Sequence, residues 1–297
     1  MIELRNVSKS FGERQAVQDL TMTVPAGEIF GLLGHNGAGK STAIGMMLGQ
    51  VWPSGGEVRV CGFDVTQQRQ HALEKVGAIF ETPVFYDYLS GWRNLQIFSH
   101  YTAQTSRQRL QEVIEWVGLT GREQSKVKTY SHGMRARLAL AQALLPRPDL
   151  LILDEPGDGL DPEGIHEMRQ TILRLRSEMG LTILLSSHLL SEVEQLCTYI
   201  AVMNQDRKVF EGPMATIHKS RNWAVLRVND FNAAVKLLRE KGLIVDERDG
   251  RLIALAAEAK TEHIVRCLVQ HDFAVHEITP QQQDLEGFYL SLMKDNE

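Results

Sequence analysis

The hydrophobic pattern of the first two thirds of the chain predicts short buried strands separated by helices. Residues 2–7 (IELRNV) alternate between apolar and polar side chains, as a half-buried strand does. A helical pattern over 134–145 ends before Pro146. Continuous apolar runs, typical of fully buried strands, lie at 28–33, 150–155 and 181–188. Apolar strands that alternate with helices predict a parallel sheet covered on both faces.

The pattern changes near residue 220. Strand-like runs at 223–228 and 273–278 enclose helical patterns at 231–242 and near 261–271. Between the helices, Asp249-Gly250 is a strong hairpin signal. The resulting β-α-β-β-α-β order predicts a small α+β domain of the ferredoxin-like type over 220–297, after a first domain over 1–219. A last helix carries an apolar stripe of Leu285, Phe288, Tyr289 and Leu292.

Composition narrows the class of protein. The 297 residues carry a net charge of −5, which gives no sign of a dedicated nucleic-acid binder. The three cysteines are far apart and form no metal-binding or disulfide pattern, which indicates a reducing compartment. The first residues lack the pattern of a signal peptide, and no apolar run is long enough to cross a bilayer. We therefore expect a cytoplasmic protein.

The segment GHNGAGKS (34–41) fits the phosphate-binding pattern G-x-x-x-x-G-K-[ST]. Its glycines let consecutive backbone N–H groups turn toward phosphate oxygens, and the following helix adds a partial positive charge. Lys40 supplies a full charge, and the Ser41 hydroxyl suits Mg²⁺. Placement between a strand and a helix favours this reading over a chance glycine-rich turn. The predicted nucleotide contacts are Gly34, His35, Asn36, Gly37, Ala38, Gly39, Lys40, Ser41 and Thr42.

Two carboxylates follow the apolar run at 150–153. Ligands of open α/β sheets sit at the carboxyl ends of the strands, where Asp154 and Glu155 would lie. Asp154 is predicted to hold Mg²⁺, directly or through water, and Glu155 to polarise an attacking water. An acidic pair is often only a solvated strand end, but the phosphate-binding segment favours function.

Over roughly residues 1–215 the chain resembles the ATP-binding subunits of ABC transporters. Phe11 stands where that family has an aromatic residue that stacks on adenine. YSHGM (130–134) stands at the family's signature position, and DGLD (158–161) matches the loop that crosses to a partner subunit. His188 matches a switch histidine that approaches the γ-phosphate. The resemblance adds these residues to the expected ATP site: Phe11, Ser131, Gly133, Met134, Asp161 and His188.

The resemblance also implies an architecture and partners. The fold would be a P-loop NTPase (RecA-like) α/β core with a mostly parallel sheet, an N-terminal antiparallel β part and a helical subdomain at about 85–145. ATP with Mg²⁺ would lie between two copies of the chain, or between it and a homologue. Separate transmembrane permease subunits would dock on the helical segment, with 84–89 as a candidate surface, on the cytoplasmic face of the membrane. The catalytic residues would be Glu155, His188 and Lys40.

Two departures from the family pattern stand out. The usual signature is LSGGQ, but Tyr130, His132 and Met134 replace its Leu, first Gly and Gln. In GAIFETP (77–83), Glu81 stands where the family carries a glutamine that contacts Mg²⁺ and water. The E-T-P variant with an S-x-G-M signature resembles the bacitracin and lantibiotic-immunity branch of multidrug-type exporters.

Two alternatives compete with a transporter ATPase. A soluble ABC-type ATPase acting on nucleic acid or ribosomes is disfavoured by the single phosphate loop, the absence of sustained heptads and the acidic charge balance. A P-loop kinase or GTPase does not explain YSHGM, DGLD and His188 together. The second domain is expected to stabilise the dimer, regulate the ATPase or bind a small effector, and its fold does not choose among these.

Overall fold

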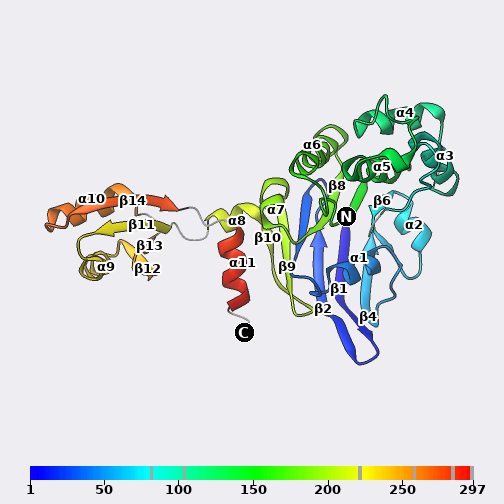
Figure 1. The fold of residues 1–297 in the computed structure, drawn as a ribbon. Coiled ribbons are helices and arrows are strands. Elements are labelled where there is room, and N and C mark those ends of the chain that lie inside the picture. Colours follow the sequence, from blue (N-terminus) through cyan, green and yellow to red (C-terminus); the bar gives the residue numbers. More distant parts are fainter. Residues whose placement is uncertain (81–82, 103–104, 220–222, 257–258, 282–284, 295–297) are drawn as a thin grey trace. The chain divides into compact units, whose positions relative to one another are not determined.

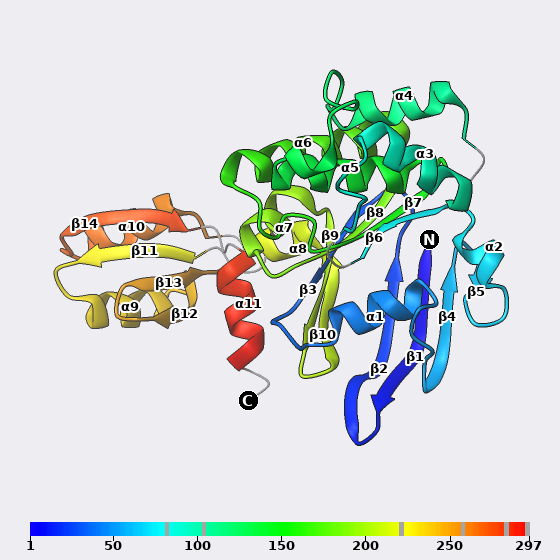
Figure 2. The same cartoon turned by 45° about the vertical axis from the view of Figure 1, so that its right-hand side comes forward.

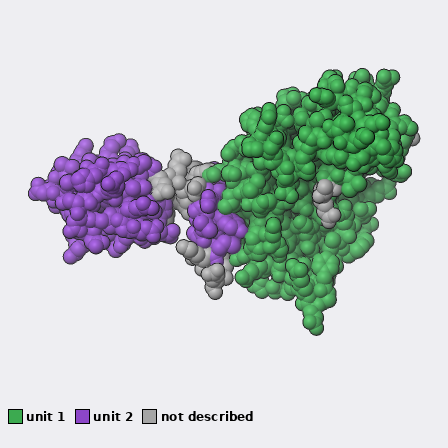
Figure 3. Space-filling model, in the orientation of Figure 1, with its two compact units in different colours: residues 1–212 green, residues 213–297 purple. Residues whose placement is uncertain are grey.

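The computed structural model describes residues 1–80, 83–102, 105–219, 223–256, 259–281 and 285–294 (Figure 1). The chain divides into two compact units, Met1–Gly212 and Pro213–Glu297 (Figure 3). This division assigns residues 213–219, which the sequence placed in the first domain, to the second unit. They include helix α8 (Met214–Lys219), which contacts helix α11 (Leu285–Lys294) of that unit. Among the described residues, no helix combines the length and apolarity needed to span a membrane.

A six-stranded sheet forms the centre of the first unit, with the order β10-β9-β3-β8-β7-β6. The neighbouring pairs β9–β3, β3–β8, β8–β7 and β7–β6 are all parallel. Every residue of β3, β7 and β8 is buried, which explains their continuous apolar sequences. The bounds are β3 (Ile29–Leu33), β6 (Val76–Ile79), β7 (Leu150–Asp154), β8 (Thr182–Ser187), β9 (Tyr199–Asn204) and β10 (Arg207–Pro213).

A second, four-stranded antiparallel sheet has the order β2-β1-β4-β5. Helix α1 (Lys40–Met47) contacts strands of both sheets, so Ile44 and Met47 belong to one continuous core. This helix follows directly on the phosphate-binding segment, and the core therefore anchors that segment. The strands are β1 (Ile2–Phe11), β2 (Arg14–Val24), β4 (Gly55–Val60) and β5 (Phe63–Asp64), followed by helix α2 (Arg69–Leu73).

Three helices, α3 (Gly91–Thr102), α4 (Arg107–Trp116) and α5 (His132–Leu144), lie together away from β1 and β2 (Figure 2). The apolar residues Leu110, Val113 and Ile114 of α4 are buried. Buried Arg109 donates to the carbonyl of Leu144, which ties α4 to the end of α5. A short 3-10 turn (Val127–Thr129) precedes α5. Two further helices, α6 (Pro162–Met179) and α7 (Leu190–Leu196), follow strands β7 and β8.

In the second unit, the elements from β11 to β14 follow the order strand, helix, strand, strand, helix, strand. Their sheet is antiparallel, with the order β12-β13-β11-β14. Leu226 and Ile253 of the sheet share a buried cluster with Leu238 and Ile264 of the helices. The bounds are β11 (Trp223–Val228), α9 (Phe231–Glu240), β12 (Ile244–Arg248), β13 (Leu252–Leu255), α10 (Thr261–Gln270) and β14 (Val275–Gln281).

Candidate active site

The phosphate-binding segment forms a tight turn between β3 and α1. Gly37 and Gly39 adopt φ values of 89° and 96°, a region that side chains disfavour. A Cβ atom at Gly39 would lie 2.4 Å from the carbonyl oxygen of Ala16, and one at Gly34 would lie 2.7 Å from that of Met203. The glycines thus allow backbone-to-backbone approach. Among the described residues, no side chain caps the N-terminus of α1, whose first N–H groups are left for a ligand.

We expect Gly39→Ala to destabilise the fold, because the added Cβ meets backbone rather than a mobile side chain. The free energy of unfolding, measured in urea, should fall by about 1–3 kcal/mol, the usual cost of local backbone strain. Gly62→Ala is the matched control, since Gly62 has a similar φ of 85° and open space around its Cβ position. Equal losses in the two variants would show that the contact with Ala16 carries no energy.

Glu155 joins the phosphate-binding segment to His188. Its Oε1 lies 3.4 Å from Lys40 Nζ, and its Oε2 lies 2.7 Å from His188 Nδ1. The His188 backbone N–H also donates to Oε2 over 3.3 Å. Lys40 is buried and donates to the Gly34 carbonyl over 2.7 Å. Three residues that the sequence marked separately therefore form one group.

Ser186 orients the acidic pair at the end of β7. The Glu155 backbone N–H donates to Ser186 Oγ over 3.0 Å, and Ser186 Oγ in turn donates to Asp154 Oδ1. Asp154 is buried, whereas Glu155 adopts an unusual positive φ of 48°. This turn in the backbone sends the two carboxylates in different directions. They are therefore available for different roles.

Lys40, Glu155 and His188 line a cavity of about 510 Å³, which we call the phosphate cavity. Its lining includes the predicted residues Asn36, Gly37, Gly39, Lys40, Ser41, Thr42, Glu155 and His188. Three further lining residues, Arg14, Ala16 and Asp158, were not predicted as site residues. Arg14 pairs with Phe11 at the end of the β1–β2 hairpin, so the basic residue in FGER was the available signal. Phe11 is not among the lining residues, and its side chain is 52% exposed. The centre of its ring lies 4.8 Å from Lys9 Nζ.

The signature segment starts helix α5. Ser131 is the N-cap, and its Oγ accepts from the Met134 N–H over 3.2 Å. Tyr130 is buried, and its hydroxyl donates to the Arg122 carbonyl over 2.8 Å. Burial raises the pKa of this Tyr130 hydroxyl, which therefore stays protonated and keeps its donor role at neutral pH. Arg135, the fourth residue of α5, forms an ion pair with Asp87 over 2.8 Å.

The remaining predicted residues are not among those that line the phosphate cavity. Asp161 is the N-cap of α6, where its Oδ1 accepts from the Gly164 N–H over 2.8 Å. Ser131, Gly133 and Met134 do not line the cavity that holds Lys40. His35 is exposed and Ala38 is buried, both within the turn. Glu81 lies outside the described residues.

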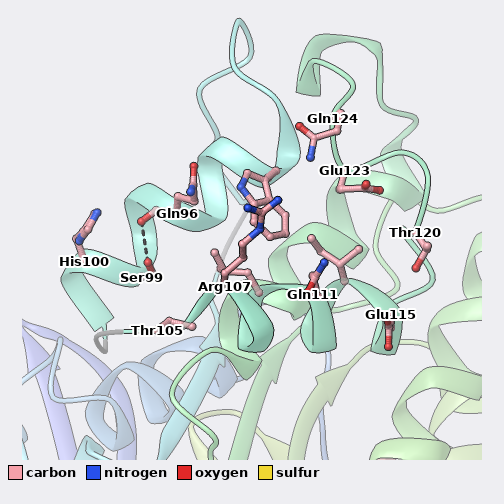
Figure 4. Close-up of a pocket in the computed structure, with 13 residues that line it drawn as sticks. Gln96, Ser99, His100, Thr105, Arg107, Gln111, Glu115, Thr120, Glu123 and Gln124 are labelled. Atoms are coloured by element: carbon pink, nitrogen blue, oxygen red, sulfur yellow. Dashed lines mark hydrogen bonds between the residues drawn. The ribbon is translucent and has the colours of Figure 1, made fainter.

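A separate cavity of about 570 Å³ lies between α3, α4 and residues 120–124 (Figure 4). Its lining is mostly polar and includes Gln96, Arg107, Gln111 and Glu123. One carboxylate oxygen of Glu123 is buried without a hydrogen-bond partner among the described residues. None of the residues predicted for the ATP site borders this cavity.

The glycine-rich turn before α1, the Lys40–Glu155–His188 group and the parallel sheet define a P-loop nucleotide-binding protein. A family model described as "ABC transporter" matches residues 17–158. A relative that aligns over nearly the whole chain, described below, carries the same family in its name. The chain belongs to the ABC transporter ATP-binding proteins. These are ATPases coupled to transport, so the chain is an ATP hydrolase of that class.

Two relatives illustrate the similarity. An uncharacterized ABC transporter ATP-binding protein, YhcH of Bacillus subtilis, is 39% identical over 98% of this chain and 95% of its own length. The bacitracin transport ATP-binding protein BcrA of Enterococcus faecalis is 37% identical over 99% of this chain and 96% of its own length. The latter confirms the resemblance to bacitracin exporters that residues 77–83 and 130–134 indicated.

Solved structures confirm the fold over about three quarters of the chain. An ATP-binding subunit of an ABC transporter is 28% identical with a TM-score of 0.65, over 74% of this chain and 92% of that one. The protein cbiO1 of Clostridium perfringens, part of the transporter complex cbiONQ, is 25% identical with a TM-score of 0.67. It covers 73% of this chain and 89% of its own.

Proposed function

We propose that this chain binds and hydrolyses ATP as one half of a dimer that drives export through separate membrane subunits. The observation that carries the proposal is the group of Lys40, Glu155 and His188 at the mouth of the phosphate cavity. It supplies a cation for phosphate, a carboxylate for water and an imidazole beside that carboxylate. Export is supported by the names of relatives that act in bacitracin transport and Nod factor export.

Each residue of the group takes a different part in hydrolysis. Lys40 binds phosphate oxygens together with the N–H groups of residues 34–42. Glu155 accepts the proton of the attacking water, and His188 holds Glu155 in place through Nδ1 and its backbone N–H. Phe11 stacks on adenine, at the end of the hairpin that also brings Arg14 to the cavity.

The residues fit Mg²⁺ only in company with the nucleotide. No group of three or more His, Cys, Asp or Glu in the described residues is placed to hold a metal ion. The side-chain oxygens of the predicted ligands, Ser41, Asp154 and Glu81, are of the hard type that Mg²⁺ takes alongside substrate phosphates. Bound there, Mg²⁺ would neutralise phosphate charge. Asp154 is held ready for this by the Ser186 hydroxyl.

Dimerisation is supported by the incompleteness of a single chain. The N-cap residue Ser131 and the backbone of Gly133 and Met134 form a helix N-terminus suited to a phosphate, yet they do not border the cavity of their own chain. In the dimer these three residues complete the nucleotide site of the second copy or homologue. Asp161, which begins α6, lies on the loop that crosses to that partner.

An exposed aromatic segment supports docking to permease subunits. Val84, Tyr86 and Tyr88 are 82%, 44% and 67% exposed within one short segment, and clustered exposed apolar side chains are a mark of interaction surfaces. Glu81 precedes this segment and would link docking to the nucleotide. We place the chain on the cytoplasmic face of the membrane, held there by permease subunits.

The second unit has the strand and helix order of a ferredoxin-like domain, and we infer that fold for residues 220–297. Its role is regulatory or dimer-stabilising. Deletion from residue 213 onward would separate these roles, because loss of a dimer contact weakens ATP-driven dimerisation whereas loss of regulation changes hydrolysis alone.

Co-purification tests the proposal as a whole. The tagged chain, expressed in its own host and extracted from membranes in mild detergent, should bring down an integral membrane protein. Replacing Val84, Tyr86 and Tyr88 with serine should reduce that recovery without changing ATP binding. Recovery of ribosomes or nucleic acid instead of a membrane protein would support a soluble ATPase and overturn the transport proposal.

A further inference from the structure

Helix α7 carries a buried carboxylate that plays no part in the hydrolysis described above. Glu192 is 7% exposed, although a glutamate is rarely buried unless it is paired. Its Oε2 accepts from Ser187 Oγ over 3.2 Å, while its Oε1 has no hydrogen-bond partner among the described residues. Burial raises the pKa of this carboxyl, opposed by the Ser187 hydrogen bond and the charge of Arg169.

The Ser187 hydroxyl connects Glu192 to the residues on both sides of His188. Ser187 Oγ accepts from the Leu189 backbone N–H over 3.0 Å while donating to Glu192. The residue before His188 therefore bonds to the Glu192 carboxylate directly, and the residue after His188 is linked to it through the Ser187 hydroxyl. His188 in turn reaches Glu155 through Nδ1 and its N–H.

The second oxygen of Glu192 lies directly against Gly157. A Cβ atom there would stand 2.5 Å from Glu192 Oε1. Gly157 itself has no positive φ, and the three atoms nearest to that Cβ position all belong to the Glu192 carboxyl group. Gly157 lies in the turn closed by the Asp158 N–H, which donates to the Glu155 carbonyl over 3.0 Å. Glu192 thus touches both loops that carry the group at the phosphate cavity.

We propose that Glu192 is a positioning residue for ATP hydrolysis: wedged between Gly157 and Ser187, it holds the His188 turn and the Glu155–Asp158 turn in register. The proposal deepens the proposed function, since it rests on Glu155 and His188 acting in hydrolysis. Glu192 is too deeply buried to act on the water itself. It acts by fixing the loop that follows β7 and the loop that follows β8, because the hydrogen bonds of the sheet end with these strands.

The test is a double-mutant cycle between positions 157 and 192 in the full chain. Glu192→Ala should lower kcat by about 10²-fold, the usual effect of a misplacement near 1 Å, with KM for ATP unchanged. Gly157→Ala should also lower kcat, because its methyl group displaces the carboxyl. In the Glu192→Ala background, Gly157→Ala should have no further effect, since the obstruction is gone.

Two more variants keep the outcome readable. Glu192→Gln keeps the size of the side chain and an acceptor for Ser187, and should rescue most of the activity that Glu192→Ala loses. Ser191→Ala, on the exposed side of α7, is the control for general damage to the helix. Multiplying effects of Gly157→Ala and Glu192→Ala would overturn the proposal, as would a rise in KM with unchanged kcat. A fully active Glu155→Gln would instead sink the proposed function, and the cycle would remain interpretable.

Discussion

Glu155→Gln should bind ATP normally and hydrolyse it about 10²–10⁴-fold more slowly, the range expected on loss of a general base. The amide keeps the size of the carboxylate and an oxygen for the His188 N–H, but it cannot take up a proton from water. The substitution also removes the negative charge that lies 3.4 Å from Lys40 Nζ. Lys40 itself is unchanged, so its contacts with phosphate should remain. Phosphate release and a fluorescent nucleotide measure the two properties separately.

Glu178→Gln provides the matched control, because Glu178 is exposed near the end of α6 and pairs with Arg174. It should hydrolyse ATP like the unchanged protein. Turnover of Glu155→Gln within a few-fold of this control would remove Glu155 from the role of base. A loss of nucleotide binding in Glu155→Gln would instead indicate a structural role.

Ser131→Arg, placed in the Glu155→Gln background, should abolish ATP-driven dimerisation while leaving nucleotide binding by the single chain intact. The long cation would occupy the helix N-terminus that we assign to the phosphate of the second copy, and it opposes the positive end of the helix dipole. We expect the dimer dissociation constant to rise at least about 30-fold, since hot-spot losses exceed about 2 kcal/mol. Light scattering with and without ATP and Mg²⁺ measures it.

Ser106→Arg controls for the damage that the substitution does to its own helix. Ser106 is the N-cap of α4 and accepts from the Arg109 N–H over 3.2 Å, as Ser131 accepts from Met134. Both substitutions therefore lose a cap of about 1 kcal/mol and add the same charge. A dimer that survives in Ser131→Arg, or that fails equally in Ser106→Arg, would contradict the assigned contact.

Much of the fold could be predicted from local pattern. The runs that became β3, β7 and β8 are continuous because both faces of the sheet are covered, and such runs are hard to mistake. Helix α7 and strand β6 were not singled out. Both are short, and neither shows a clear period, so only their pairing and packing in the folded chain define them.

The candidate site was partly readable for the same reason. The turn at 34–42 and the acidic pair after β7 are local signals, whereas the hydroxyl of Ser186 gains its role through contacts with Asp154 and Glu155, over thirty residues away. Arg14 likewise lines the cavity from the turn end of the β1–β2 hairpin, a position that its local sequence does not reveal. Contacts of this kind depend on tertiary structure, and composition does not reveal them.

Helix α1 contacts both sheets of the first unit and has six of its eight residues buried, Lys40 among them. Close-packed interiors resist small displacements, so we expect α1 to keep its position in the core during ATP binding and hydrolysis. Labels that report local mobility, attached to α1, should therefore give the same signal with and without ATP and Mg²⁺.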